Sequence, residues 1–130
     1  DDGNLDRIQS IKGWVDAKGE PQDQVFDVVW SGDRKAGKDG KVPAVGNTVD
    51  VKTATYTNAI GSSELIGRWT DPQFDPTQGA VYYVRVLQIP TPRWSTYDAV
   101  RARLPLLEGV AATVQERAWS SPIWYSPANL

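Results

Sequence analysis

The residues best placed to do chemistry are Arg93 and Trp94, which close the proline-bearing segment PTPRW at 90–94. Proline fixes its own φ and restricts the residue before it, so this bend should be stiff. A guanidinium held on a stiff bend matches phosphate or carboxylate oxygens bidentately. The alternative is a cation–π or ion-pair contact inside the domain. Arg93 and Trp94 are therefore the most site-like residues of the chain.

A second pair of candidates, Asp33 and Arg34, lies in the segment WSGDR at 30–34. The polar, glycine-rich stretch 31–46 is too long for a tight turn, so it is either a functional loop or an exposed excursion. A local ion pair between the two side chains is the simpler interpretation. The functional interpretation is an acid–base pair in this loop.

The chain has six tryptophans, and core packing is expected for Trp14, Trp30, Trp69 and Trp119, because each lies on or ends a candidate strand. Trp94 and Trp124 lie beside loop residues instead. Exposed, coplanar rings with polar neighbours would form a stacking platform for sugar rings. Trp94 and Trp124 are therefore the candidates for a carbohydrate- or surface-binding module.

The chain contains no histidine and no cysteine. These absences exclude a Ser-His-Asp triad, a thiolate nucleophile and cysteine-ligated zinc within this sequence. Asp71 and Asp75 offer carboxylates to a hard cation such as calcium, but in a proline-bearing loop they fit turn caps better. We therefore assign no catalytic residue, no metal ligand and no cofactor to this chain.

Length and charge limit the class of protein further. The 130 residues are the usual size of one domain, so we expect a single β-rich domain over 1–130. There are 14 Lys and Arg against 16 Asp and Glu, a net charge of -2. This balance lacks the excess of positive charge that is typical of nucleic-acid-binding domains. No apolar run approaches 18 residues, so no membrane span is expected.

The element that should position these residues is the strand expected over 80–89, AVYYVRVLQI. Aromatic and β-branched residues favour a pleated sheet. Both alternating faces of this strand are largely apolar, which is typical of a central strand covered on two sides. Pro90 and Pro92 should end it because proline cannot donate to the ladder.

Shorter strands are expected around it. One helix is expected over 95–103, STYDAVRAR, with Ser95 as its N-cap and Asp98 three residues further on. A loop is expected over 16–24. The remaining expected strands are 5–15, 25–30, 47–56, 64–70, 113–119 and 122–125. Several short strands with one minor helix predict a mainly β fold, an antiparallel β-sandwich-like domain.

The chain also resembles a known family. The resemblance is carried, in order, by the phrases LDRIQSIKGWVD, VVWSGDRK, VGNTVDV, ATYTNAIGSSEL, WTDPQFDP, AVYYVRVLQIPTPRWSTYDA and ERAWSSPIWYSP. They resemble the C-terminal part of a family of exported bacterial proteins of unknown function. That family is related to the PHP-type (polymerase and histidinol phosphatase) metal-dependent phosphoesterases. The match is less clear over 36–41 and 100–112.

The resemblance implies that this chain is the C-terminal β domain of a larger periplasmic or secreted hydrolase. The catalytic barrel would lie N-terminal to it, in the same parent protein or in a separate processed chain, and would hold the divalent metal. The β domain would pack on that barrel, and the PTPRW bend with Arg93 or the WSGDR loop with Arg34 would contribute to the rim of its active site. The abrupt start at Asp1 fits a processed product or a fragment. Two alternatives remain: a carbohydrate- or surface-binding module, and a structural subunit whose end strand completes a neighbour's sheet.

Overall fold

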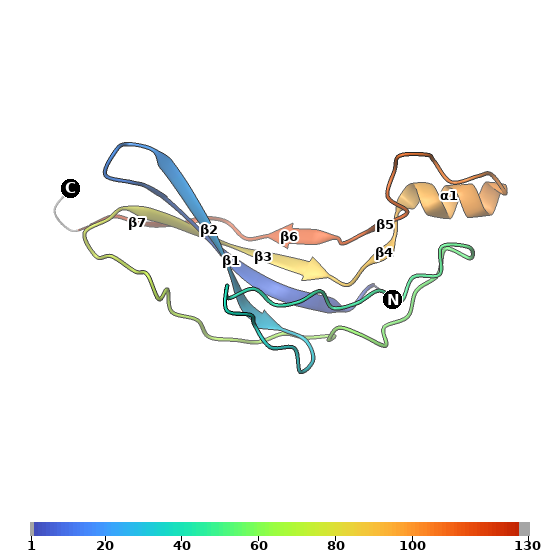
Figure 1. Ribbon diagram of the computed structural model, residues 1–130, viewed down its shortest axis with the longest axis horizontal. Helices are drawn as coiled ribbons and strands as arrows, with labels where there is room; N and C mark the ends of the chain where they lie inside the picture. The colour runs from blue at the N-terminus through green and yellow to red at the C-terminus, as the bar shows by residue number, and fades with distance from the viewer. Residues whose placement is uncertain (1, 128–130) are drawn as a thin grey trace.

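The computed structural model describes residues 2–127, and within them the chain forms an antiparallel sheet of five strands (Figure 1). The elements are β1 (Leu5–Val15), β2 (Pro21–Trp30), β3 (Ala80–Gln88), β4 (Thr91–Pro92), α1 (Trp94–Ala102), β5 (Thr113–Val114), β6 (Arg117–Trp119) and β7 (Ile123–Tyr125). β4 and β5 make a separate two-stranded sheet. The expected mainly β, antiparallel fold with one short helix is confirmed.

The β1–β2 hairpin is closed by the side chain of Asp16. Its Oδ1 accepts hydrogen bonds from the backbone N–H groups of Lys18 (2.9 Å) and Glu20 (3.0 Å). Gly19 has a φ of 85°, a conformation that glycine adopts without steric cost. The loop is shorter than the predicted 16–24, because β2 begins at Pro21.

β3 is the central strand, as the sequence predicts. It pairs with β1 along one edge, where Tyr82 lies opposite Lys12 and Arg85 lies opposite Gln9. Along its other edge it pairs first with β7 and then with β6. The sheet order is β2-β1-β3-β6, with β7 also on β3. One continuous strand therefore organises both the N-terminal hairpin and the C-terminal segment.

The strand predicted over 47–56 is wrong. Asp50 and Thr55 instead exchange two backbone hydrogen bonds across a tight turn, in which Ala54 has a φ of 50°. The side-chain Oδ1 of Asp50 accepts from the N–H of Lys52 at 2.9 Å. Short polar side chains that bond their own backbone compete with sheet formation, and the alternating pattern did not reveal this competition.

The strand predicted over 64–70 is also wrong. This stretch belongs to a long segment, residues 64–78, that crosses one face of the sheet without joining its ladder; we call it the strap. Trp69 packs on Phe26 with ring centroids 5.0 Å apart. A Cβ on Gly67 would lie 2.9 Å from Val29, so the strap approaches the sheet closely there. Trp69 packs onto β2 while Ile66 is exposed, so only part of the apolar pattern reflects burial against the sheet.

The helix lies one residue earlier than predicted, at Trp94–Ala102, and Ser95 is inside its first turn. Arg93 occupies the N-cap position with extended backbone and no side-chain cap. The helix is anchored by Thr96, whose Oγ1 donates to the carbonyl of Ala112 at 2.7 Å. α1 is the only helix of the described residues, and it is too short and too polar to cross a membrane.

The interior of the sheet is unusually polar. Asp6, Arg7 and Lys12 are all buried on β1, at 1%, 9% and 3% exposure. Several large apolar side chains are nevertheless exposed, and they include Trp94, Trp119 and Trp124. Charged residues are almost never fully buried unless they are paired, so the charges of β1 need partners inside the fold.

Candidate functional site

Arg93 and Trp94 lie where β4 passes into α1, at one end of the elongated molecule (Figure 1). The backbone N–H of Arg93 donates to the carbonyl of Ala112 at 2.9 Å, which fixes the bend. The Nε of Arg93 is buried and has no hydrogen-bond partner among the described residues. Trp94 is 71% exposed. The bend therefore holds one arginine whose side-chain donors are incompletely used, beside an exposed indole.

The guanidinium of Arg34 is used inside the domain. Its Nη1 lies 2.8 Å from Oδ1 of Asp6 and donates to the carbonyl of Pro43 at 2.8 Å. Its Nη2 donates to the carbonyl of Asp6 at 2.9 Å and to the hydroxyl of Ser31. The ion pair is thus with Asp6, while Asp33 is an exposed loop residue. Arg34 anchors the loop to the sheet.

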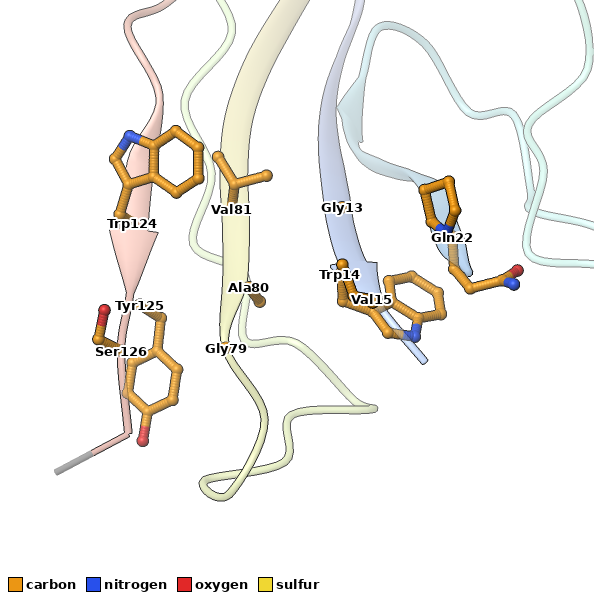
Figure 2. Close-up of a pocket in the computed structure, with 11 residues that line it drawn as sticks. Gly13, Trp14, Val15, Gln22, Gly79, Ala80, Val81, Trp124, Tyr125 and Ser126 are labelled. Atoms are coloured by element: carbon orange, nitrogen blue, oxygen red, sulfur yellow. The ribbon is translucent and has the colours of Figure 1, made fainter. Parts of the chain in front are cut away.

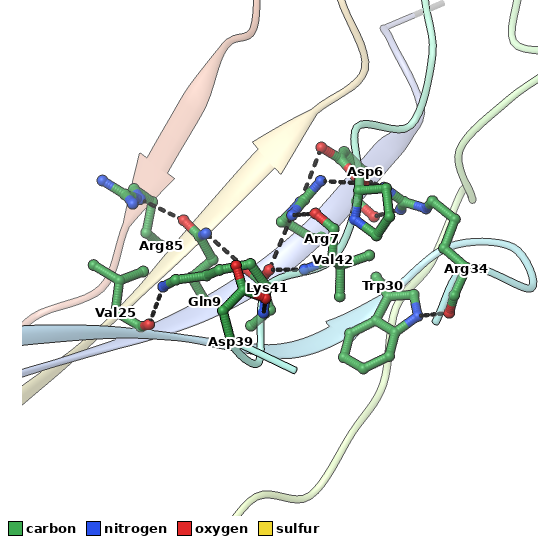
Figure 3. Close-up of polar contacts among 12 residues, drawn as sticks. Asp6, Arg7, Gln9, Val25, Trp30, Arg34, Asp39, Lys41, Val42 and Arg85 are labelled. Atoms are coloured by element: carbon green, nitrogen blue, oxygen red, sulfur yellow. Dashed lines mark hydrogen bonds and ion pairs between the residues drawn. The ribbon is translucent and has the colours of Figure 1, made fainter. Parts of the chain in front are cut away.

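Around Arg34, a set of buried polar groups joins β1, β2 and the 34–43 loop (Figure 3). Arg7 donates from Nη1 to Oδ2 of Asp27 at 3.0 Å and to the carbonyl of Val42 at 2.7 Å. Asp27 also accepts from Gln9 Nε2 at 2.7 Å and from the N–H of Val42 at 2.8 Å. We call Asp6, Arg7, Gln9, Asp27 and Arg34 the arginine cluster.

The electrostatics of the arginine cluster favour the charged form of Asp27. Burial acts to raise the pKa of this carboxyl, but the hydrogen bonds from Val42 and Gln9 and the guanidinium of Arg7 outweigh it. The net result is a pKa lowered from 3.8. A carboxylate that is ionised and bonded on both oxygens has no free lone pair directed at a substrate, so the cluster is suited to structure rather than to acid–base catalysis.

A second buried group lies on the other face of the sheet. Lys12 donates from Nζ to Oδ2 of Asp71 at 2.7 Å and to the carbonyl of Gln73 at 2.7 Å. The hydroxyl of Tyr82 donates to the same Asp71 oxygen at 2.7 Å. Burial and this hydrogen bond raise the pKa of Tyr82 to about 12. Lys12, Asp71 and Tyr82, here named the lysine clamp, hold the strap onto β1 and β3.

The carboxylates considered for calcium are already used within the strap. Asp71 belongs to the lysine clamp, and Oδ1 of Asp75 accepts from the N–H and the hydroxyl of Thr77 at 2.8 and 2.7 Å. Within residues 2–127 no three side chains of His, Cys, Asp or Glu gather in a way that could hold a metal ion. The geometry fits turn caps.

Trp124 borders a shallow groove of about 450 Å³ at the β7 end of the sheet. Figure 2 shows Trp124, Val81 and Gly13 in a row across β7, β3 and β1, with Trp14 and Tyr125 lower in the same groove. Trp124 is 74% exposed. In Figure 1, β7 and α1 lie at opposite ends of the molecule, so Trp94 and Trp124 share no platform.

The candidate residues from the sequence therefore do not converge on one site. The arginine cluster and the lysine clamp were not predicted, although one signal was present in the sequence. Asp27 interrupts the otherwise apolar run VFDVVW, and Asp6, Arg7 and Lys12 stand on a strand with apolar residues on both parities. A charge on a strand that is covered on both faces needs a buried partner, but the sequence does not say which.

The fold and these contacts define a mainly β domain whose buried carboxylates are paired with buried cations. A family model described as a protein of unknown function (DUF3604) matches residues 1–127. The chain belongs to that family. No curated protein and no solved structure matches the chain.

Proposed function

We propose that the chain is the non-catalytic β domain of an exported, metal-dependent hydrolase of the PHP-related phosphoesterase type. In this proposal it packs on a catalytic body that is not contained in residues 1–130. That body supplies the histidines and the divalent metal, and the whole protein works in the periplasm or outside the cell. The β domain supplies structure and, at Arg93, one side of the rim.

The surface area carries the proposal. The chain exposes 9050 Å², roughly a third more than the ~6,800 Å² expected of a compact monomer of its mass. Several large apolar side chains are exposed on this surface, among them Trp119, Ile123 and Trp124. Exposed apolar side chains beyond a scattered few are a mark of interaction sites. The chain has the surface of a part that packs on another body.

The polar interior supports a structural role as well. Each buried carboxylate of the arginine cluster and the lysine clamp lies within 3.1 Å of a cationic nitrogen. Such carboxylates are stabilised in place and are not positioned to bind a metal or to take a proton from a substrate. The absence of histidine agrees with catalysis by residues outside this chain.

A second candidate is a binding module for ring-shaped ligands such as sugars. The exposed ring of Trp124 beside Trp14 and Tyr125 favours it, because aromatic rings can stack on the apolar faces of sugars. The two candidates differ in one respect that is easily measured. A binding module functions as an independent unit, whereas the domain of a hydrolase is held against a larger body.

Native mass spectrometry of the protein purified from its source tests the proposal. We expect the chain to travel with a larger, histidine-containing body, either as one polypeptide or as two. That material should hydrolyse p-nitrophenyl phosphate or its diester when divalent metal is present, and a chelator should abolish the activity. The 130-residue chain alone should be inactive. A native mass equal to the single chain would remove the hydrolase proposal and favour the binding module.

The rim hypothesis makes a kinetic prediction about Arg93. In the whole hydrolase, Arg93→Ala should lower kcat/KM for phosphoesters about 10- to 100-fold, since one charge-assisted hydrogen bond contributes roughly 1.5–3 kcal/mol. Arg93→Lys should recover part of that loss. Arg68→Ala, on the exposed strap, is the matched control and should leave kcat/KM unchanged. Unaltered kinetics in Arg93→Ala would mean that the bend is not at the active site.

A further inference from the structure

One continuous segment carries most of the exposed apolar side chains. Every residue of 101–111 and of 116–124 is exposed. Of the large apolar residues that are exposed, seven belong to this segment: Leu104, Leu106, Leu107, Val110, Trp119, Ile123 and Trp124. Exposed apolar side chains gathered in one stretch of chain indicate an interaction surface. We call residues 101–124 the C-terminal face; within it Trp119 and Trp124 lie on one side of the sheet, and Ile123, opposite Tyr82, lies on the other.

The C-terminal face extends along the molecule. β7 and β6 lie one after the other on the outer edge of β3, and the 103–112 loop continues beside α1 (Figure 1). β3 alone has nine residues, which span about 30 Å at ~3.3 Å per residue. A covering partner must therefore be at least that long, which is more than a small ligand or one side chain can supply.

The two edges of the sheet are protected unequally. At the β2 edge, Pro21 cannot donate a hydrogen bond, Asp23 is charged and exposed, and Lys41 Nζ donates to the carbonyl of Val25. Charges and proline on an edge strand prevent pairing with other chains. Over 117–125 the opposite edge carries one charge, Arg117, and one proline, Pro122, which lies between the three-residue strands β6 and β7. This edge exposes Trp119 and Trp124, so it carries less charge and more apolar surface than the β2 edge.

The size of the exposed surface also limits the partner. An interface of standard size buries about 800 Å² on each partner, and the excess surface of this chain is more than twice that. Exposed charges of both signs, Arg103 and Arg117 with Glu108 and Glu116, form no ion pair with the residues that the structure describes. The partner should therefore be a folded body with an apolar surface and charges of both signs at its border.

We infer that the C-terminal face is the surface by which this chain docks on the catalytic body of the proposed hydrolase. The inference rests on the proposed function and adds to it the place of contact. Trp119 and Trp124 are the anchors: the register places them on the same face of the sheet, opposite Arg85 and Val81 of β3. Large aromatic side chains near the centre of an interface contribute most of its binding energy.

Oxidative footprinting tests the inference on the native protein, with the isolated 130-residue chain as reference. Modification of Trp119 and Trp124 should be at least about 10-fold slower in the native protein. Ile66, which is 80% exposed on the strap, is the internal control and should react equally in both samples. The leucines at 104, 106 and 107 should be protected together with the tryptophans.

The outcomes distinguish the docking surface from the proposed function. A larger native body with reactive Trp119 and Trp124 overturns the docking surface and leaves the proposed function standing. A native mass of one chain overturns both. A native mass of two copies of the chain, with both tryptophans protected, replaces the catalytic body by a second copy and also overturns the inference.

A double variant, Trp119→Ser with Trp124→Ser, provides a second readout. Both side chains are exposed in the chain, so the isolated variant should keep its fold and its circular dichroism spectrum. In the native protein, the leucines at 104, 106 and 107 should lose their protection and react as fast as in the isolated chain. Ile66→Ser is the matched control and should leave their protection intact. Unchanged protection in the double variant would contradict the assignment of the anchors.

Discussion

Asp27→Ala is expected to lower the free energy of unfolding by about 3–5 kcal/mol, the usual cost of removing one partner from a buried ion pair. The Asp27 side chain is 0% exposed and that of Arg7 is 11% exposed, so the guanidinium would keep its charge with little water to solvate it. The N–H of Val42 and the amide of Gln9 would lose their acceptor at the same time. A loss of this size is a large part of the stability of a single domain.

Urea denaturation of wild type and variant gives the measurement. Asp33→Ala is the matched control, because Asp33 is an exposed carboxylate just beyond the end of β2; it should change the stability by no more than about 0.5 kcal/mol. Equal losses in the two variants would show that the arginine cluster does not hold the sheet and the loop together.

Asp27 also determines how the stability of the fold should change with pH. The folded-state pKa of Asp27 is lowered from 3.8, so the folded protein binds a proton less readily than the unfolded chain does. The stabilisation is therefore complete above about pH 4 and is lost as the pH falls through the folded-state pKa. In Asp27→Ala the fall in stability on acidification should be shallower than in wild type.

Asp71→Ala should have a comparable effect, about 3–5 kcal/mol, because it leaves the charge of Lys12 buried at 3% exposure. The carbonyl of Gln73 would be its remaining bonded partner among the described residues. The strap would lose its ionic link to β1 and its hydrogen bond to β3. We expect the 64–78 segment to become sensitive to proteolysis well before the sheet unfolds.

Spectrophotometric titration of tyrosine tests whether the loss of stability in Asp71→Ala comes from the loss of the lysine clamp. In wild type the pKa of Tyr82 is about 12; without the Asp71 carboxylate it should fall toward its usual value of 10. Lys12→Met in the Asp71→Ala background should restore much of the stability, since no charge would remain buried without a partner. Asp75→Ala, a turn cap on the same strap, is the control and should cost about 1 kcal/mol or less.

The sequence predicts the strands that depend on burial and fails where local hydrogen bonding competes. β3 was located correctly because apolar residues on both parities require cover on both faces. The 47–56 segment has the polar–apolar alternation of a strand. However, the Asp50 side chain accepts a hydrogen bond from the N–H of Lys52, and the segment forms a turn. Alternation records which side chains face the core, and it does not record whether the backbone joins a ladder.

The candidate site was harder to predict for a related reason. Arg34 and Asp33 are neighbours in sequence, but Arg34 pairs with Asp6 on another strand. Such long-range pairing follows from the packing of the loop on the sheet, which composition and spacing do not specify. Trp94 and Trp124 are exposed as expected, but Trp119, which was expected in the core, is 58% exposed because it lies on the outer strand β6. The separation of Trp94 and Trp124 to opposite ends could be learned only from the fold.

The charged residues of β1 have a consequence for how the chain folds. One edge of β1 pairs with β2, its neighbour in sequence, across a short turn. The other edge of β1 pairs with β3, which is far away in the sequence. Non-local pairing of this kind slows folding. A shift of one residue in the arriving strand would turn Arg85 away from Gln9 and Tyr82 away from Asp71, leaving buried polar groups unpaired. The polar interior thus raises the free energy of a misaligned β1–β3 pairing, so it selects the native register of the sheet.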